Sequence, residues 1–171
     1  MRTAGLLGYN SNKDRPFLIR EATDQVEPST QEFLVRMASE ELQQNSWDWT
    51  RFDTFITRAI QLTALFAESG RQDRAIGLLD ECLGVLRGIA RTHPGAEQFR
   101  HRNRVLEAIC NYNVAVLLVE GLQNDSLHAE ALELVNSAVD RLYEVDLDDH
   151  TESYGRTMNA VVALGGILTH R

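Results

Sequence analysis

Residues 61–70 read QLTALFAESG, and residues 75–82 follow them as AIGLLDEC. A second copy of this pattern begins at residues 113–122, which read NVAVLLVEGL, and continues at residues 131–138 as ALELVNSA. Each copy predicts a helix, a turn and a second helix, with small residues at matching offsets. Repetition of such a helix pair is typical of α-solenoids, whose members bind other proteins far more often than they catalyse reactions.

Apolar residues recur with a period near 3.6 along most of the chain, and no stretch alternates long enough to predict a strand. Ser29-x-x-Glu32 after Pro28 forms a capping box that predicts a helix start. Ser69-Gly70 and His93-Pro94-Gly95 predict helix ends. We therefore expect an all-α domain of about six helices. Its expected parts are an irregular leader at 1–27, then a single domain at 28–171 with a capping helix at 29–45, repeat one at 48–92, repeat two at 96–145 and an unpaired last helix at 150–170.

Composition excludes several classes of protein. The formal net charge of −8 disfavours nucleic acid as the main ligand, because phosphate binding needs a basic surface. No apolar run approaches the roughly 18 residues that predict a transmembrane helix, and residues 1–20 lack the apolar core of a signal peptide. Cys82 and Cys110 both fall inside predicted helices and look like buried thiols, so we expect a reducing, cytoplasmic environment.

The repeated pattern resembles the tetratricopeptide repeat. That family alternates small and large residues at set positions. In the first copy these positions are taken by Thr63, Phe66, Gly70, Ala75, Leu79 and Cys82, and in the second by Ala115, Leu118, Leu122, Ala131, Val135 and Ala138. Leu122 stands where the family has glycine, and the two copies lie farther apart than the usual repeat length. The resemblance implies a right-handed α-solenoid of antiparallel helix pairs with somewhat longer helices.

A second family is similar to fewer residues. The segments at 58–66, 111–114 and 162–165 are similar to the end of the PUL domain, an armadillo-like solenoid found in adaptors of the ubiquitin pathway. That resemblance implies docking to an AAA-ATPase. The first half of such a domain has no counterpart in this chain, and both resemblances share the expectation of a helical solenoid.

The tetratricopeptide resemblance also implies a binding groove along the leading helix of each pair. The groove positions fall on Thr57, Gln61, Ala64, Glu68, Tyr112, Asn113, Val116 and Glu120. Tyr112 offers a stacking surface, and the Asn113 amide can hydrogen-bond an extended peptide backbone. The alternative is that Asn113 caps local packing and Tyr112 fills the core. The lysines and arginines with which the family clamps chaperone carboxylates are absent from these positions, which disfavours chaperone tails as ligands.

No residue pattern predicts catalysis or cofactor binding. The five histidines have no metal-ligand spacing, and the acidic run at 144–152 lacks the central glycine of a calcium loop. The basic run at 100–104 could meet an acidic partner or form a solvated face. An enzyme with dispersed residues and a helical RNA-binding protein remain competing classes, neither of which has support in the spacing.

The expected function is therefore non-catalytic binding of a protein or peptide, as a scaffold or adaptor, or a purely structural role in a larger assembly. The last predicted helix is apolar at Val161, Val162, Leu164, Ile167 and Leu168. A solenoid that ends without a polar cap exposes an apolar edge. We expect this edge to pack on a second copy of the chain or on further repeats.

Overall fold

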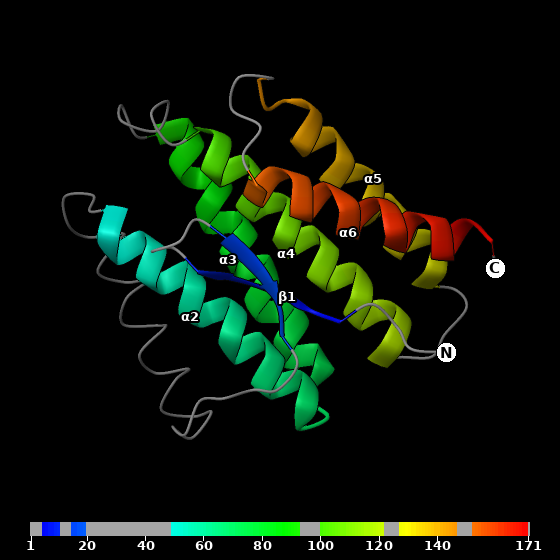
Figure 1. The fold of residues 1–171 in the computed structure, drawn as a ribbon. Coiled ribbons are helices and arrows are strands. Elements are labelled where there is room, and N and C mark those ends of the chain that lie inside the picture. The colour runs from blue at the N-terminus through cyan, green and yellow to red at the C-terminus, as the bar shows by residue number, and fades with distance from the viewer. Residues whose placement is uncertain are drawn as a thin grey trace.

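The computed structural model describes residues 5–10, 15–19, 49–92, 100–121, 127–146 and 152–170. In these ranges the chain forms five helices and a two-stranded sheet (Figure 1). Their bounds are β1 (Leu7–Asn10), β2 (Arg15–Leu18), α2 (Trp49–Glu68), α3 (Gln72–Thr92), α4 (Arg100–Gly121), α5 (Leu127–Tyr143) and α6 (Glu152–Thr169). The predominantly helical fold expected from the sequence is confirmed. The expected capping helix at 29–45 lies outside the described residues.

The turn between α2 and α3 follows the sequence closely. Gly70 has a φ of 76°, a left-handed conformation that glycine adopts without steric cost. The Arg71 N–H donates to the Phe66 carbonyl at 2.8 Å, and the Gly70 N–H donates to the Ala67 carbonyl at 3.1 Å. These two bonds satisfy carbonyls that the end of α2 would otherwise leave unpaired. The second helix then begins two residues later, at Gln72.

Each helix packs mainly on the next one in the chain, and α4 is the centre of the domain. α2 contacts α3, α3 contacts α4, α4 contacts α5, and α6 contacts both α5 and α4. Every residue of α4 from Val105 to Leu118 is buried. The small and large positions of both repeat copies that fall on the helices are buried as well, namely Thr63, Phe66, Ala75, Leu79, Cys82, Ala115, Leu118, Ala131, Val135 and Ala138.

A buried carboxylate ties three of these helices together. The Glu107 side chain in α4 is 1% exposed, and its Oε2 lies 3.2 Å from Arg141 Nε in α5 and 4.0 Å from Arg87 Nε in α3. Arg104 Nη1 lies 3.5 Å from Glu107 Oε1, and its Nε lies 2.9 Å from Glu144 Oε2. Arg104, the last member of the basic run, is therefore neutralised within the chain. Opposite charges at this junction offset the cost of burying Glu107.

The N-terminal segment differs from the irregular leader that we expected. β1 and β2 form an antiparallel hairpin in which Leu7 pairs with Leu18 and Tyr9 with Pro16. β1 contacts α2 and α4, and β2 contacts α6, so the hairpin lies across three helices (Figure 1). Each strand has four residues, which are too few for an alternation of apolar and polar residues to be recognised in the sequence. The side-chain hydrogen bonds that Tyr112 and Asn113 make to this segment come from more than a hundred positions away.

The last helix also differs from expectation. Val161, Leu164 and Leu168 are buried in the domain, and Ile167 is half-buried. Of the five apolar residues assigned to an open edge, Val162 alone is largely exposed, at 58%. Most of the apolar edge that the sequence predicted on the last helix is buried within the domain, because α6 packs one face against α5 and α4. Gly165 permits this close approach, since a Cβ there would lie 3.3 Å from Val135 Cγ1.

Candidate functional site

Two polar residues of α4 reach the N-terminal hairpin. Asn113 is fully buried, and both ends of its side-chain amide are hydrogen-bonded to the backbone of one residue. The Leu7 N–H donates to Asn113 Oδ1 at 2.8 Å, and Asn113 Nδ2 donates to the Leu7 carbonyl at 2.8 Å. A side-chain amide in this arrangement replaces the edge of a neighbouring β-strand.

The register of the hairpin explains why Leu7 is available to this amide. The Ile19 N–H donates to the Leu6 carbonyl at 2.8 Å, so the backbone groups of Leu6 face β2. Backbone groups of successive residues in an antiparallel pair point to opposite edges. The N–H and carbonyl of Leu7 therefore point away from β2, to the edge that Asn113 covers. Without Asn113, both groups would be buried without a partner.

The side chains of β1 anchor it to the same face. Leu7 and Tyr9 are both buried and belong to the hydrophobic core. The guanidinium of Arg102 in α4 lies over the Tyr9 ring, 5.4 Å from its centroid, which is within the range of a cation–π contact. The side chains of Leu7 and Tyr9 therefore point into the domain, while the backbone edge of β1 contacts Asn113. We call the surface of α2, α4 and α6 that receives the hairpin the strand-binding face.

Tyr112 extends the contact toward the start of β1. Its hydroxyl donates to the Gly5 carbonyl at 3.1 Å. Burial raises the pKa of Tyr112 to about 12, and the negative charge of Glu120 adds to this effect. The phenol is therefore neutral, and a hydrogen-bond donor, across the physiological range. Gly5 and Leu7 are two residues apart, so both bonds are made along one edge of the same extended segment.

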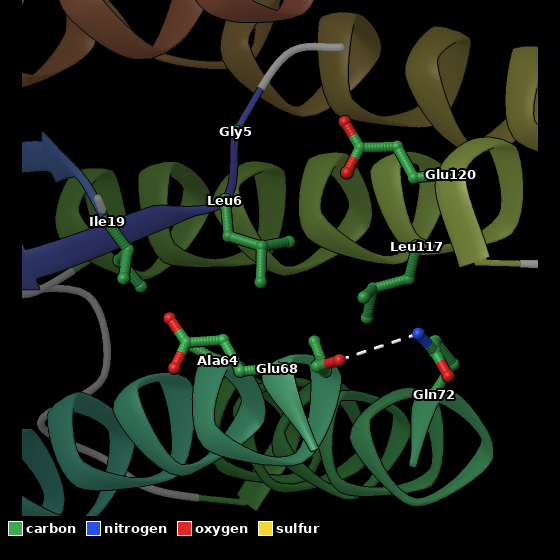
Figure 2. Close-up of a pocket in the computed structure, with 9 residues that line it drawn as sticks. Gly5, Leu6, Ile19, Ala64, Glu68, Gln72, Leu117 and Glu120 are labelled. Atoms are coloured by element: carbon green, nitrogen blue, oxygen red, sulfur yellow. Dashed lines mark hydrogen bonds between the residues drawn. The ribbon is translucent and has the colours of Figure 1, made fainter. Parts of the chain in front are cut away.

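A pocket of about 340 Å³ opens at the beginning of this segment (Figure 2). Its wall is formed by the hairpin, α2, the start of α3 and α4; the residues are Gly5, Leu6, Ile19, Ala64, Ala67, Glu68, Gln72, Leu117 and Glu120. Leu6 points into the pocket, and the carboxylates of Glu68 and Glu120 lie on opposite sides of it (Figure 2). Both glutamates are exposed. The pocket thus has apolar walls and an acidic rim.

The groove residues inferred from the sequence fall into four groups. Tyr112 and Asn113 contact the hairpin, whereas Ala64, Glu68 and Glu120 line the pocket beside it. Gln61 and Thr57 are half-buried on α2 and line neither feature. Val116 is buried, so its side chain is part of the core.

The alternative reading of the sequence, in which Tyr112 fills the core and Asn113 satisfies packing, is partly right. Both side chains are buried, but their polar atoms bind an extended strand of the chain itself. Sequence reasoning missed the strand residues Gly5, Leu7 and Tyr9. The signal that could have found them is the triplet Leu7-Gly8-Tyr9, where two large apolar residues flank a glycine.

Two side chains of the strand-binding face can hydrogen-bond a peptide backbone. The amide of Asn113 and the hydroxyl of Tyr112 bind backbone groups, which every peptide carries. Burial raises the pKa of Cys110 to about 12 and that of Cys82 well above its ordinary value, so both remain thiols at neutral pH. Within the described ranges, no group of three or more His, Cys, Asp or Glu side chains is placed to hold a metal ion.

Among the described helices, none combines the length and the apolar character that crossing a bilayer requires.

Comparison with known proteins adds no family to these observations. The sequence matches no protein-family model, and no curated protein or solved structure matches it. The case for a function therefore rests on the geometry of the strand-binding face.

Proposed function

We propose that this chain is a non-catalytic protein-binding module that takes an extended segment of a partner protein on its strand-binding face. The observation that carries the proposal is the paired hydrogen bond between the Asn113 amide and the backbone of Leu7. These bonds recognise the backbone of a strand, and recognition of a strand through its backbone is a recurring mode of peptide binding.

The order of the helices supports this proposal. Helix α4 carries Tyr112 and Asn113, and α2 and α6 flank the hairpin that these residues hold. If the helix pairs are read as a tetratricopeptide-like solenoid, α2, α4 and α6 are its leading helices. In that family the leading helices line the concave groove, which is the position of the strand-binding face.

Assembly through α6 is a second candidate with narrower support. Val162 is 58% exposed, and its neighbour Ala163 is exposed as well. An apolar face of this size would take part in a small contact between two copies of the chain.

The free, buried cysteines suit a reducing compartment, so we propose that the chain binds its partner in the cytoplasm.

A peptide-display selection tests the main proposal without knowledge of the partner. The full chain is used to select extended peptides from a random library. The selected peptides are then measured against Asn113→Leu and against Asn136→Leu, which makes the same change at an exposed position of α5. Peptides that keep their affinity for Asn136→Leu and lose it for Asn113→Leu support the strand-binding face. Peptides that bind both variants as tightly as the wild type would refute it.

A further inference from the structure

The strand-binding face is already occupied, and its occupant is part of the same chain. Leu7 and Asn113 are 106 residues apart in sequence, so their two hydrogen bonds join distant parts of the polypeptide. We propose that the N-terminal hairpin is a built-in competitor for the partner segment, and that its seated sequence gives the pattern the partner must carry. This inference rests on the proposed function, because it concerns the same face.

The pattern follows from the side chains of β1. Leu7, whose backbone binds Asn113, has a buried side chain. Tyr9, two positions later, has a buried ring that lies against Arg102. Two positions before Leu7, the Gly5 carbonyl accepts the hydrogen bond from Tyr112. A partner segment that fits this face therefore reads apolar–x–aromatic in an extended conformation, and its backbone carbonyl two positions before the apolar residue accepts from Tyr112.

The positions between these residues are less restricted. The backbone groups of Leu6 face β2, and its side chain is half-buried at the pocket. Leu18, which pairs with Leu7 across the hairpin, is 49% exposed. Pro16 of β2 is buried, but the side-chain hydrogen bonds of Tyr112 and Asn113 in α4 are all made with Gly5 and Leu7. A single partner strand could therefore replace the hairpin and keep the hydrogen bonds to α4.

Competition between the hairpin and a partner has a predictable size. A tethered segment acts at an effective concentration on the order of millimolar for a short flexible link. A partner segment with the same contacts must compete with the hairpin. The apparent affinity of the partner is its intrinsic affinity multiplied by the fraction of molecules in which the face is open. The free protein would therefore bind weakly, and opening the hairpin would raise its affinity.

The test uses the full chain and a synthetic peptide with the sequence of residues 4–20. The first variant is Leu7→Asp/Tyr9→Ser, which removes both buried anchors of the hairpin and leaves the helices intact in sequence. The second is Leu7→Pro, which keeps an apolar side chain but removes the N–H that donates to Asn113 Oδ1. The second variant serves if the first fails to fold. A peptide with an N-methyl group on its Leu7 residue is the matched control, because it lacks the same donor.

We expect the opened chain to bind the unmodified peptide at least about 10-fold more tightly than the wild type does. The N-methyl peptide should bind the opened chain about 10-fold more weakly than the unmodified peptide, because it leaves Asn113 Oδ1 without a donor. Equal affinity of the wild type and the opened chain, with the N-methyl penalty intact, would overturn the competition and leave the proposed function standing. If neither folded variant binds the peptide, the face does not accept a strand in trans, and both proposals fail.

Discussion

Asn113 holds the N–H and the carbonyl of Leu7 at 2.8 Å each, although the two residues are 106 positions apart in the chain. This pair joins the most buried helix of the domain to its N-terminal strand. A leucine at position 113 would preserve volume but leave both Leu7 groups without a partner.

Asn113→Leu should therefore lower the free energy of unfolding by about 1–3 kcal/mol, the usual cost of stranding buried polar groups. Urea denaturation followed by circular dichroism measures this loss. Asn136→Leu on the exposed side of α5 is the control, and we expect it to stay within about 0.5 kcal/mol of the wild type. Equal stability of the two variants would mean that the hairpin contributes little to the fold.

Glu107 and Glu144 belong to one network of ion pairs, but we expect their replacement to lower the free energy of unfolding by different amounts. Glu107 is 1% exposed and Glu144 is 39% exposed, and both contact Arg104 and Arg141. Glu107→Gln should lower the free energy of unfolding by about 1–3 kcal/mol, because the buried side chain loses its ion pairs with Arg104 and Arg141. Glu144→Gln should cost no more than about 1 kcal/mol, since water replaces the lost partner. Denaturant titration of the two variants decides the matter, and similar costs would contradict the burial of Glu107.

The elevated pKa of Tyr112 predicts a loss of stability at high pH. The pKa of the phenol is about 12 in the folded chain and near 10 when it is exposed, so the folded state binds the proton more tightly. Its contribution is fully present below pH 10 and is lost as the pH rises from about 10 to about 12. The loss amounts to about 2–3 kcal/mol when both states are ionised.

Tyr112→Phe isolates this contribution. The variant lacks the hydroxyl, so its stability should fall less between pH 10 and pH 12 than that of the wild type. Absorbance at 295 nm should show one late-titrating phenol fewer in the variant. A Tyr112 that titrates near its ordinary pKa would contradict the burial of the phenol.

Neighbouring valines on α6 separate the buried face of this helix from its exposed one. Val161 is fully buried, and Val162 is 58% exposed. Val161→Ala should cost about 2 kcal/mol through lost burial and the cavity left behind. Val162→Ala should stay within about 0.5 kcal/mol of the wild type. If α6 is a contact between copies, light scattering should show that Val162→Glu shifts the mass toward the monomer, and an unchanged mass would remove that role.

Local sequence signals were enough to predict most helices but could not predict the site. The helix ends predicted at Ser69-Gly70 and His93-Pro94-Gly95 agree with the structure, in which α3 spans Gln72–Thr92. Asn113 was assigned to a groove because its segment resembles the tetratricopeptide repeat. Its ligand could not be inferred, because β1 has four residues and its binding depends on α4.

The same limit explains the other misses. Glu107 receives its counter-charges from Arg87 and Arg141 on different helices, and no spacing within α4 reveals them. In α6, periodicity alone leaves open which apolar residues face inward. The packing of α6 against α5 and α4 decides that Val161 is buried and Val162 is not.

The acidic rim of the pocket predicts a charge preference in the partner segment. Glu68 and Glu120 flank the point where the seated strand begins, at Gly5 (Figure 2). A peptide of residues 4–20 with Lys at position 4 should bind the opened chain about 2–5-fold more tightly than one with Glu there. Such a ratio is usual for exposed ion pairs and should shrink in about 0.5 M salt.

Glu68→Gln/Glu120→Gln, introduced into the opened chain, provides the control for this preference. Removal of both carboxylates should abolish the difference between the Lys and Glu peptides, while the penalty of N-methylation at Leu7 remains. Isothermal titration calorimetry measures the Lys and Glu peptides against the opened chain and against the double variant. The preference for Lys depends on charge, whereas the N-methylation penalty depends on a backbone hydrogen bond, so the two effects can be separated. A preference for Lys that survives in the double variant would locate its source outside the pocket.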